Sequence, residues 1–273
     1  MESKKPIISA TDIIKIFKVG AQDVQVLKSV SLEVDDGDFM IIFGPSGCGK
    51  STLLHIILGL ESPTSGKVIF AGGDIYNNTT EDDRSALRKQ LVGMVYQQPN
   101  WVKSLNVIEN VSFPLMLLGN EKSTAQTKAL EILKTVSMDS WASYYPTELS
   151  SGQQQRIALA RALVNNPEII IADEPTGNLD YESGQEMMQL LYDVNQKQGK
   201  TIIMVTHDLE YMKFAKTAVR MLDGQIIEKL HGDQKAKLTK GLKSKRLKVS
   251  LREKDAVKNI KDTVIKNQPA DNA

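Results

Sequence analysis

The chain has 273 residues and a net charge of +1, which is enough length for one large domain or two small ones. Hydrophobic residues make up 41% and charged residues 25%, as in ordinary globular proteins. No apolar run approaches the ~20 residues that a membrane-spanning helix needs, so we expect that this chain does not form a pore. We also expect no signal peptide, and the single Cys48 excludes an internal disulfide.

The expected elements alternate between strands and helices. Strands are predicted, in chain order, at 7–8, 26–27, 30–34, 39–43, 66–70, 91–96, 169–172, 201–205, 218–222 and 225–228. Helices are predicted at 50–58, across 107–165 with a break at Pro146, at 182–198 and at 209–214. Alternation predicts an α/β fold with a parallel sheet. The strand-rich beginning favours an additional antiparallel layer, and the 107–165 block favours a helical subdomain.

A glycine-rich segment lies between the strand predicted at 39–43 and the helix predicted at 50–58. It matches the phosphate-loop pattern G-x-x-x-x-G-K-[ST] with Gly44, Pro45, Ser46, Gly47, Cys48, Gly49, Lys50 and Ser51. Glycines allow successive backbone N–H groups to point at a phosphate, and the helix that follows adds its positive end. We expect Lys50 to reach the β- and γ-phosphates of a nucleotide, and the Ser51 hydroxyl to bind Mg²⁺.

Two acidic residues and a histidine follow later apolar strands. Asp173 and Glu174 end the apolar run 169–172, and His207 comes shortly after the run 202–205. In a parallel sheet, ligands bind beyond the carboxyl ends of the strands. Asp173 is therefore predicted to bind Mg²⁺, and Glu174 to accept a proton from the attacking water. A lone histidine is more often structural, but its place at this edge favours a γ-phosphate contact for His207.

The segment Leu149-Ser150-Ser151-Gly152-Gln153 resembles the signature of ABC ATPases, usually Leu-Ser-Gly-Gly-Gln. The resemblance spans residues 7–230 and includes, in order, the phosphate loop, Gln97, the signature, Asp173-Glu174, Asp180 and His207. Segment 172–180 further resembles the subgroup of lipoprotein-releasing, macrolide-export and cell-division ATPases, as do 63–66, 109–111 and 162–167. The resemblance implies a RecA-like P-loop NTPase core with an antiparallel β-subdomain and an α-helical subdomain.

The resemblance also implies roles for particular residues. Lys50, Ser51 and Thr52 would bind phosphates and Mg²⁺, and Gln97 would contact Mg²⁺ and water and link the site to a membrane permease. Two copies would form a head-to-tail homodimer that encloses two ATP molecules. In it, Ser150, Ser151, Gly152 and Gln153 would face the other subunit's ATP, with Asp180 at the dimer seam. Phe17 matches the aromatic residue that stacks on adenine, although a core aromatic residue would look the same.

The sequence departs from the family pattern at two positions and leaves three hypotheses about function. Ser151 replaces a glycine of the signature, and Lys103 stands where subgroup relatives often carry proline. One hypothesis is an ATPase that energises a permease for export or extraction of a lipid, lipoprotein, peptide or drug. A second is a cell-division type ATPase that controls cell-wall hydrolases. A third is an ATPase that acts on DNA or ribosomes. The DNA-acting type is disfavoured because Gln97 and the signature lie too close together for the coiled-coil insertion that it needs. The ribosome-acting type is disfavoured because it carries two ATPase cassettes in one chain, and this chain holds one.

Residues 231–273 are expected to form a basic extension beyond the ATPase domain. Residues 229–273 hold 13 lysines and arginines against 5 aspartates and glutamates. Within them, Val257, Ile260 and Val264 follow helical spacing, which is compatible with an amphipathic helix on an anionic membrane surface. A solvated charged tail is the alternative, and no motif indicates nucleic acid. We expect the protein in the cytoplasm, peripheral on the inner face of the cell membrane.

Overall fold

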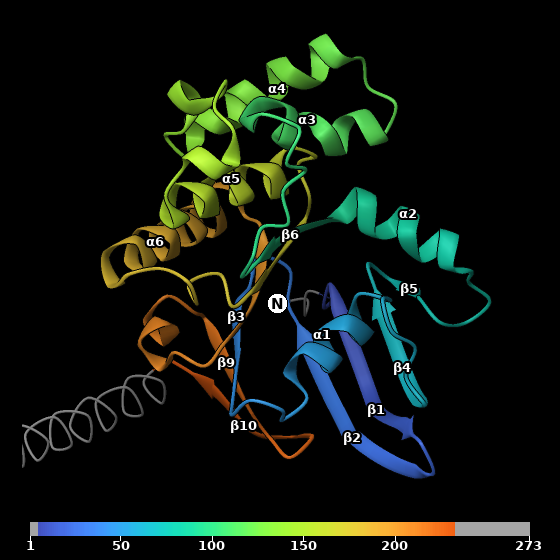
Figure 1. Ribbon diagram of the computed structural model, residues 1–273. Coiled ribbons are helices and arrows are strands. Elements are labelled where there is room, and N and C mark those ends of the chain that lie inside the picture. The colour runs from blue at the N-terminus through green and yellow to red at the C-terminus, as the bar shows by residue number, and fades with distance from the viewer. Residues whose placement is uncertain (1–4, 233–273) are drawn as a thin grey trace, which may run out of the picture. The chain divides into compact units, whose positions relative to one another are not determined.

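The computed structural model describes residues 5–232, and the basic extension predicted beyond them lies outside this range. A six-stranded sheet forms the centre of the described fold (Figure 1). Its strand order is β10-β9-β3-β8-β7-β6, and all neighbouring strands are parallel except β9 and β10. The strands are β3 (Phe39–Phe43), β6 (Val92–Tyr96), β7 (Ile169–Asp173), β8 (Thr201–Thr206), β9 (Thr217–Leu222) and β10 (Gln225–His231). Strands β3 and β8 are buried throughout, which explains their continuous apolar runs.

A second, antiparallel sheet lies on the side of helix α1 (Lys50–Ile57), as Figure 1 shows. Its order is β2-β1-β4-β5, formed by β1 (Ile8–Val19), β2 (Gln22–Val34), β4 (Ser65–Phe70) and β5 (Gly73–Asp74). Apolar side chains of this sheet, of α1 and of the central sheet form one buried core. Burial of this apolar surface fixes α1, and with it the loop that precedes α1, between the two sheets.

The third part is a group of helices, drawn at the top of Figure 1. It contains α3 (Val107–Leu117), α4 (Lys122–Thr135) and α5 (Ser151–Leu163), with the short 3₁₀ helices η1 (Asp139–Trp141) and η2 (Pro146–Glu148) between them. The three longer helices pack on one another, and α6 (Tyr181–Gln198) packs on α5. The expected RecA-like core, antiparallel subdomain and helical subdomain are therefore confirmed.

Several element predictions were wrong in detail. Segments 26–27 and 30–34 belong to one long strand, β2, and of the predicted strand 7–8 only Ile8 belongs to β1, as its first residue. The hairpin end of these strands is exposed on both faces, so its sequence lacks the alternation that marks a half-buried strand. Helix α2 (Glu81–Leu91) was not predicted, because it buries none of its residues. The helix predicted at 209–214 is the 3₁₀ helix η3 (Leu209–Lys213).

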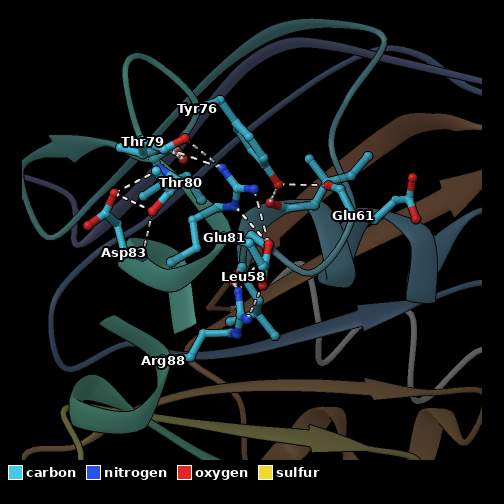
Figure 2. Close-up of polar contacts among 12 residues, drawn as sticks. Leu58, Glu61, Tyr76, Thr79, Thr80, Glu81, Asp83 and Arg88 are labelled. Carbon is cyan, nitrogen blue, oxygen red and sulfur yellow. Dashed lines mark hydrogen bonds and ion pairs between the residues drawn. The ribbon is translucent and has the colours of Figure 1, made fainter. Parts of the chain in front are cut away.

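Polar side chains hold the carboxyl end of α1 against α2, as Figure 2 shows. The Tyr76 hydroxyl lies 2.6 Å from the Ile56 carbonyl oxygen, and Arg88 donates to the Gly59 carbonyl at 2.8 Å. Arg84 and Arg88 both pair with Glu81 of their own helix. The last carbonyls of a helix lack partners within it, and cations are favourable there. This network therefore fixes the end of α1 that lies away from the phosphate loop.

Candidate active site

The strand register brings the predicted site residues to one edge of the central sheet. Phe43 is paired with Thr206, and Asp173 with both Val205 and Tyr96. The segments that follow β3, β6, β7 and β8 therefore leave the sheet at the same edge. These segments carry the phosphate loop, Gln97, Glu174 and His207. In sheets of this type, that edge is where ligands bind.

The phosphate loop is closed around its own lysine. The Lys50 ammonium donates to the carbonyl oxygens of Gly44 at 2.9 Å and Pro45 at 3.0 Å, and only 8% of the residue is exposed. Gly49 precedes α1 with φ of 100°, a conformation that favours glycine. Pro45, Ser46, Gly47 and Ser51 are exposed, Thr52 is half-buried, and Cys48 is buried. An exposed backbone turn at a helix N-terminus is suited to bind an anion.

The acid pair and the histidine lie next to this loop. His207 Nδ1 lies 2.9 Å from Glu174 Oε2, and the histidine side chain is 69% exposed while the glutamate side chain is 21% exposed. Glu174 has a φ of 48°, in the left-handed region, and its backbone N–H donates to the Val205 carbonyl at 2.9 Å. Such a backbone conformation costs on the order of 1–3 kcal/mol and is frequent at functional sites. Here it turns the chain sharply after β7.

Asp173 lies near charged groups of the acid pair and of α1. Burial raises the pKa of its carboxyl group, and the nearby charge of Glu174 raises this pKa further. The positive charges of His55 and Lys50 partly oppose this increase in the Asp173 pKa. The carboxylate therefore lies in a place where additional positive charge would be favourable.

Gln97 lies against the loop that follows Glu174. Its Nε2 donates to Asn178 Oδ1 at 3.3 Å, and Asn178 Nδ2 donates back to the Gln97 carbonyl at 3.3 Å. A Cβ added to Gly177 would lie 2.6 Å from Gln97 Nε2, so a side chain at 177 would displace the amide. The structure thus brings Gln97 together with the acid-pair loop.

The signature residues and Asp180 form a separate group of two neighbouring helix starts. The Ser150 hydroxyl accepts from the Gln153 N–H at 3.3 Å, and the Gln153 side chain accepts from the Ser150 N–H at 2.9 Å. At the start of α6, the Asp180 carboxylate accepts from both the N–H and the hydroxyl of Ser183, each at 2.9 Å. Gly152 faces Ser183, whose Oγ would lie 3.0 Å from an added Cβ. Ser150, Ser151 and Asp180 are all exposed.

Phe17 lies on β1 of the antiparallel sheet and is half-buried. The Lys15 ammonium lies 4.7 Å from the centre of the Phe17 ring, and it also donates to the Ser62 carbonyl at 2.6 Å and pairs with Glu61. Sequence analysis did not single out Lys15. Lys15 could have been found because Ile13, Lys15 and Phe17 alternate along a strand, which places the lysine on the same face as two apolar residues.

A phosphate loop and an acid pair at one edge of a parallel sheet define a P-loop ATPase. A family model described as ABC transporter matches residues 27–177. An uncharacterized ABC transporter ATP-binding protein of Methanocaldococcus jannaschii, MJ1508, is 44% identical over 221 residues, which cover 81% of this chain and 98% of the relative. The chain therefore belongs to the ABC transporter family, as an ATP-binding subunit that hydrolyses ATP.

Two solved structures resemble the described fold. The ATP-binding cassette MJ0796 of the same archaeon, a dimer in a post-hydrolysis state bound to ADP and Pi, is 38% identical with a TM-score of 0.76. This match covers 82% of our chain and 98% of that one. CbiO1 from Clostridium perfringens, part of the ABC transporter complex cbiONQ, is 25% identical with a TM-score of 0.77, covering 93% and 99%.

Proposed function

We propose that two copies of the chain assemble head to tail, so that the signature of each copy contacts the ATP bound to the other. The observation that carries this proposal is the exposed N-terminus of α5. Ser150 and Ser151 are exposed there, and the Ser150 hydroxyl satisfies only the Gln153 N–H of the first turn. Free N–H groups at a helix N-terminus favour an anion such as a γ-phosphate. The dimeric state of MJ0796 supports the same assembly.

We assign the hydrolytic chemistry to the residues at the sheet edge. Lys50 would move from the Gly44 and Pro45 carbonyls to the phosphates, which are stronger acceptors for an ammonium group. Glu174 would accept the proton of the attacking water, and His207, already 2.9 Å from it, would contact the γ-phosphate. Gln97 would orient the water. Phe17 would stack on the adenine ring.

Ser51, Gln97 and Asp173 fit a magnesium ion that arrives with the nucleotide. All three offer oxygen ligands, which Mg²⁺ prefers, and the raised pKa of the Asp173 carboxyl group marks a place that favours a cation. Within residues 5–232, no cluster of three or more His, Cys, Asp or Glu side chains is placed to hold a metal. Phosphate oxygens would therefore complete the ligand set. When bound, the ion would neutralise charge on the phosphates.

We further propose that the ATPase domain spans 7–230 and acts on a separate integral-membrane permease at the inner face of the cell membrane. None of the helices in the described part is long and apolar enough to cross a membrane. One end of α3 supports a partner there, because Phe113, Met116, Leu117 and Leu118 are all exposed. The similarity of segment 172–180 to one subgroup favours export or extraction of a lipid, lipoprotein, peptide or drug.

The extension at 231–273 is proposed to attach weakly to an anionic bilayer. Its excess of basic residues supports long-range attraction, and its sparse apolar residues support only shallow insertion. Full-length protein and a variant lacking 235–273 would be sedimented with anionic vesicles at low and raised salt. We expect the full-length protein to bind more at low salt. Equal sedimentation of both proteins at every salt concentration would contradict membrane attachment by the extension.

Capture from native membranes tests the partner. Tagged protein would be incubated with detergent-solubilised membranes of its own cells, with and without ATP. We expect an integral-membrane protein to be recovered with the parent chain, and much less of it with Leu117→Glu, which places a charge on the exposed end of α3. Recovery of no membrane protein by a chain that still hydrolyses ATP would contradict the permease partnership.

A further inference from the structure

A buried amide on the signature helix contacts two loops of the active site. Gln155 of α5 is only 3% exposed, and its Nε2 donates to the carbonyl oxygens of Tyr96 and Pro175, each at 2.8 Å. Tyr96 directly precedes Gln97, and Pro175 directly follows Glu174. A single NH₂ group with two donors is thus fully used by the two backbone segments.

Two further side chains of α5 hold the segment after Gln97. Trp101 Nε1 donates to Gln154 Oε1 at 2.9 Å. Arg161 donates to the Pro99 carbonyl, and its guanidinium lies 4.5 Å from the centre of the Trp101 ring. Burial lowers the pKa of Arg161. Helix α5 therefore contacts residues 96–101 through three of its side chains, and of these three Gln155 also hydrogen-bonds the loop after Glu174.

These contacts restrict how the parts of the site can move. Glu174 sits in a left-handed turn, so its carboxylate position depends on what holds the turn on both sides. Val205 holds the side before it, through the Glu174 N–H, and Gln155 holds the side after it, through the Pro175 carbonyl. If the amide of Gln155 were removed, the carbonyls of Tyr96 and Pro175 would each lose a donor, and the turn would lose this hydrogen bond to α5.

We propose that Gln155 is a positioning residue for hydrolysis, which holds the loops of Glu174 and Gln97 in fixed register with the signature helix. This inference rests on the proposed role of Glu174 as the base. The amide of Gln155 bonds the loops after β6 and β7 and not the phosphate loop, so its loss should affect the position of the water-activating carboxylate more than the phosphate loop. A displacement of about 1 Å at such a group lowers turnover by up to about 100-fold.

The test compares Gln155→Leu with a matched variant, Asn195→Leu. Asn195 is also a buried amide, 4% exposed, and its Nδ2 donates to two backbone carbonyls, of Gly37 at 3.1 Å and Lys200 at 2.7 Å. It lies at the far end of α6 from Asp180. Both variants lose the same kind of bonds, so both should melt at a lower temperature. The readouts are kcat and KM for ATP hydrolysis by the full-length protein, with melting temperature.

We expect Gln155→Leu to lower kcat about 10- to 100-fold with KM changed less than about threefold. Asn195→Leu should keep the parental kcat. A parental kcat in Gln155→Leu, an equal loss of kcat in both variants, or a rise in KM that matches the fall in kcat would each overturn the inference.

Gln155→Glu keeps the shape of the side chain and provides a test should the leucine variant not fold. An ionised carboxylate repels both carbonyls, whereas a protonated carboxyl group donates to one of them. We therefore expect the ratio of variant to parental kcat to rise as pH falls, and a pH-independent ratio would contradict the inference. Glu174→Gln is measured in parallel. If it retains parental turnover, the proposed base and the Gln155 inference both fail; if it is inactive while Gln155→Leu and Gln155→Glu are parental, only the inference fails.

Discussion

Glu174→Gln tests the proposed general base without disturbing the rest of the site, because it changes one carboxylate oxygen to an NH₂ group and little else. The glutamate side chain is 21% exposed, and its backbone is held by the Val205 carbonyl. An amide has the same shape and retains an atom that can hydrogen-bond with His207 at the observed 2.9 Å. We therefore expect the fold and the left-handed turn to be retained, with a change in unfolding free energy within about 0.5 kcal/mol.

The effect on turnover should be much larger than the effect on binding. A positioned general base contributes about 10²- to 10⁴-fold, which is about 2.7–5.5 kcal/mol of transition-state stabilisation. The phosphate loop and Lys50 are untouched, so ATP affinity should not fall, and ATP should accumulate in a stable dimer. Phosphate release gives kcat, a fluorescent ATP analogue gives Kd, and size-exclusion chromatography with and without ATP gives the oligomeric state.

A matched control lies at the opposite end of the same strand. Glu168 directly precedes β7, is exposed, and receives the same chemical change in Glu168→Gln. We expect Glu168→Gln to keep the parental kcat and to show the same oligomeric state as the parent with and without ATP. Parental turnover in Glu174→Gln would refute the assignment of the base, and equal losses in both variants would show that the loss does not depend on position.

Three further predictions concern other parts of the site. Asp173→Asn should raise the melting temperature of the nucleotide- and magnesium-free protein at neutral pH. Because the pKa of Asp173 is raised in the folded state, the ionised carboxylate lowers the free energy of unfolding at neutral pH. The gain in melting temperature from asparagine should therefore vanish as pH falls towards 3.8, the ordinary pKa of aspartate. A gain in melting temperature that does not depend on pH would contradict this prediction. Ser151→Gly should leave ATP affinity of the monomer unchanged but alter dimerisation or turnover, whereas a changed monomer affinity with parental dimerisation would refute the contact across the dimer. Because Cys48 is buried, maleimide should label it slowly, and Mg-ATP should slow labelling further; equal rates with and without nucleotide would count against its place in the loop.

The parts of the fold that could be predicted are those whose signal is local in the sequence. The strand before Gly44 is a continuous apolar segment, and the helix that begins at Lys50 follows the glycine pattern directly; both were confirmed. Helix α2 has a local signal too, the capping box of Thr80 and Asp83, but without an apolar face it was missed. The exposed end of β1 and β2 has no such signal.

Residues of the candidate site could likewise be predicted where their signal is local in the sequence, and not where it is spread over distant segments. The positions of Asp173, Glu174 and His207 follow from strand ends, and the structure brings the last two into contact. The partners of Gln155 lie 59 and 20 residues away in the sequence, so no local pattern indicates them. Its only trace is a glutamine where a helix otherwise buries apolar residues. The structure places the acid pair and His207, but the roles assigned to them, and to Phe17, Ser150 and Asp180, stay predictions.

The polar network at the carboxyl end of α1 has a consequence for the phosphate loop at its other end. Arg88 donates to the carbonyls of Leu58 and Gly59, which directly follow α1, and so restrains α1 from shifting along its axis. The helix is about 12 Å long at 1.5 Å per residue. Substitution of Arg88 is therefore expected to alter phosphate affinity, although Arg88 lies outside the phosphate loop. Since α1 is anchored at this end, we expect the backbone of the phosphate loop to keep its position in the fold when ATP binds.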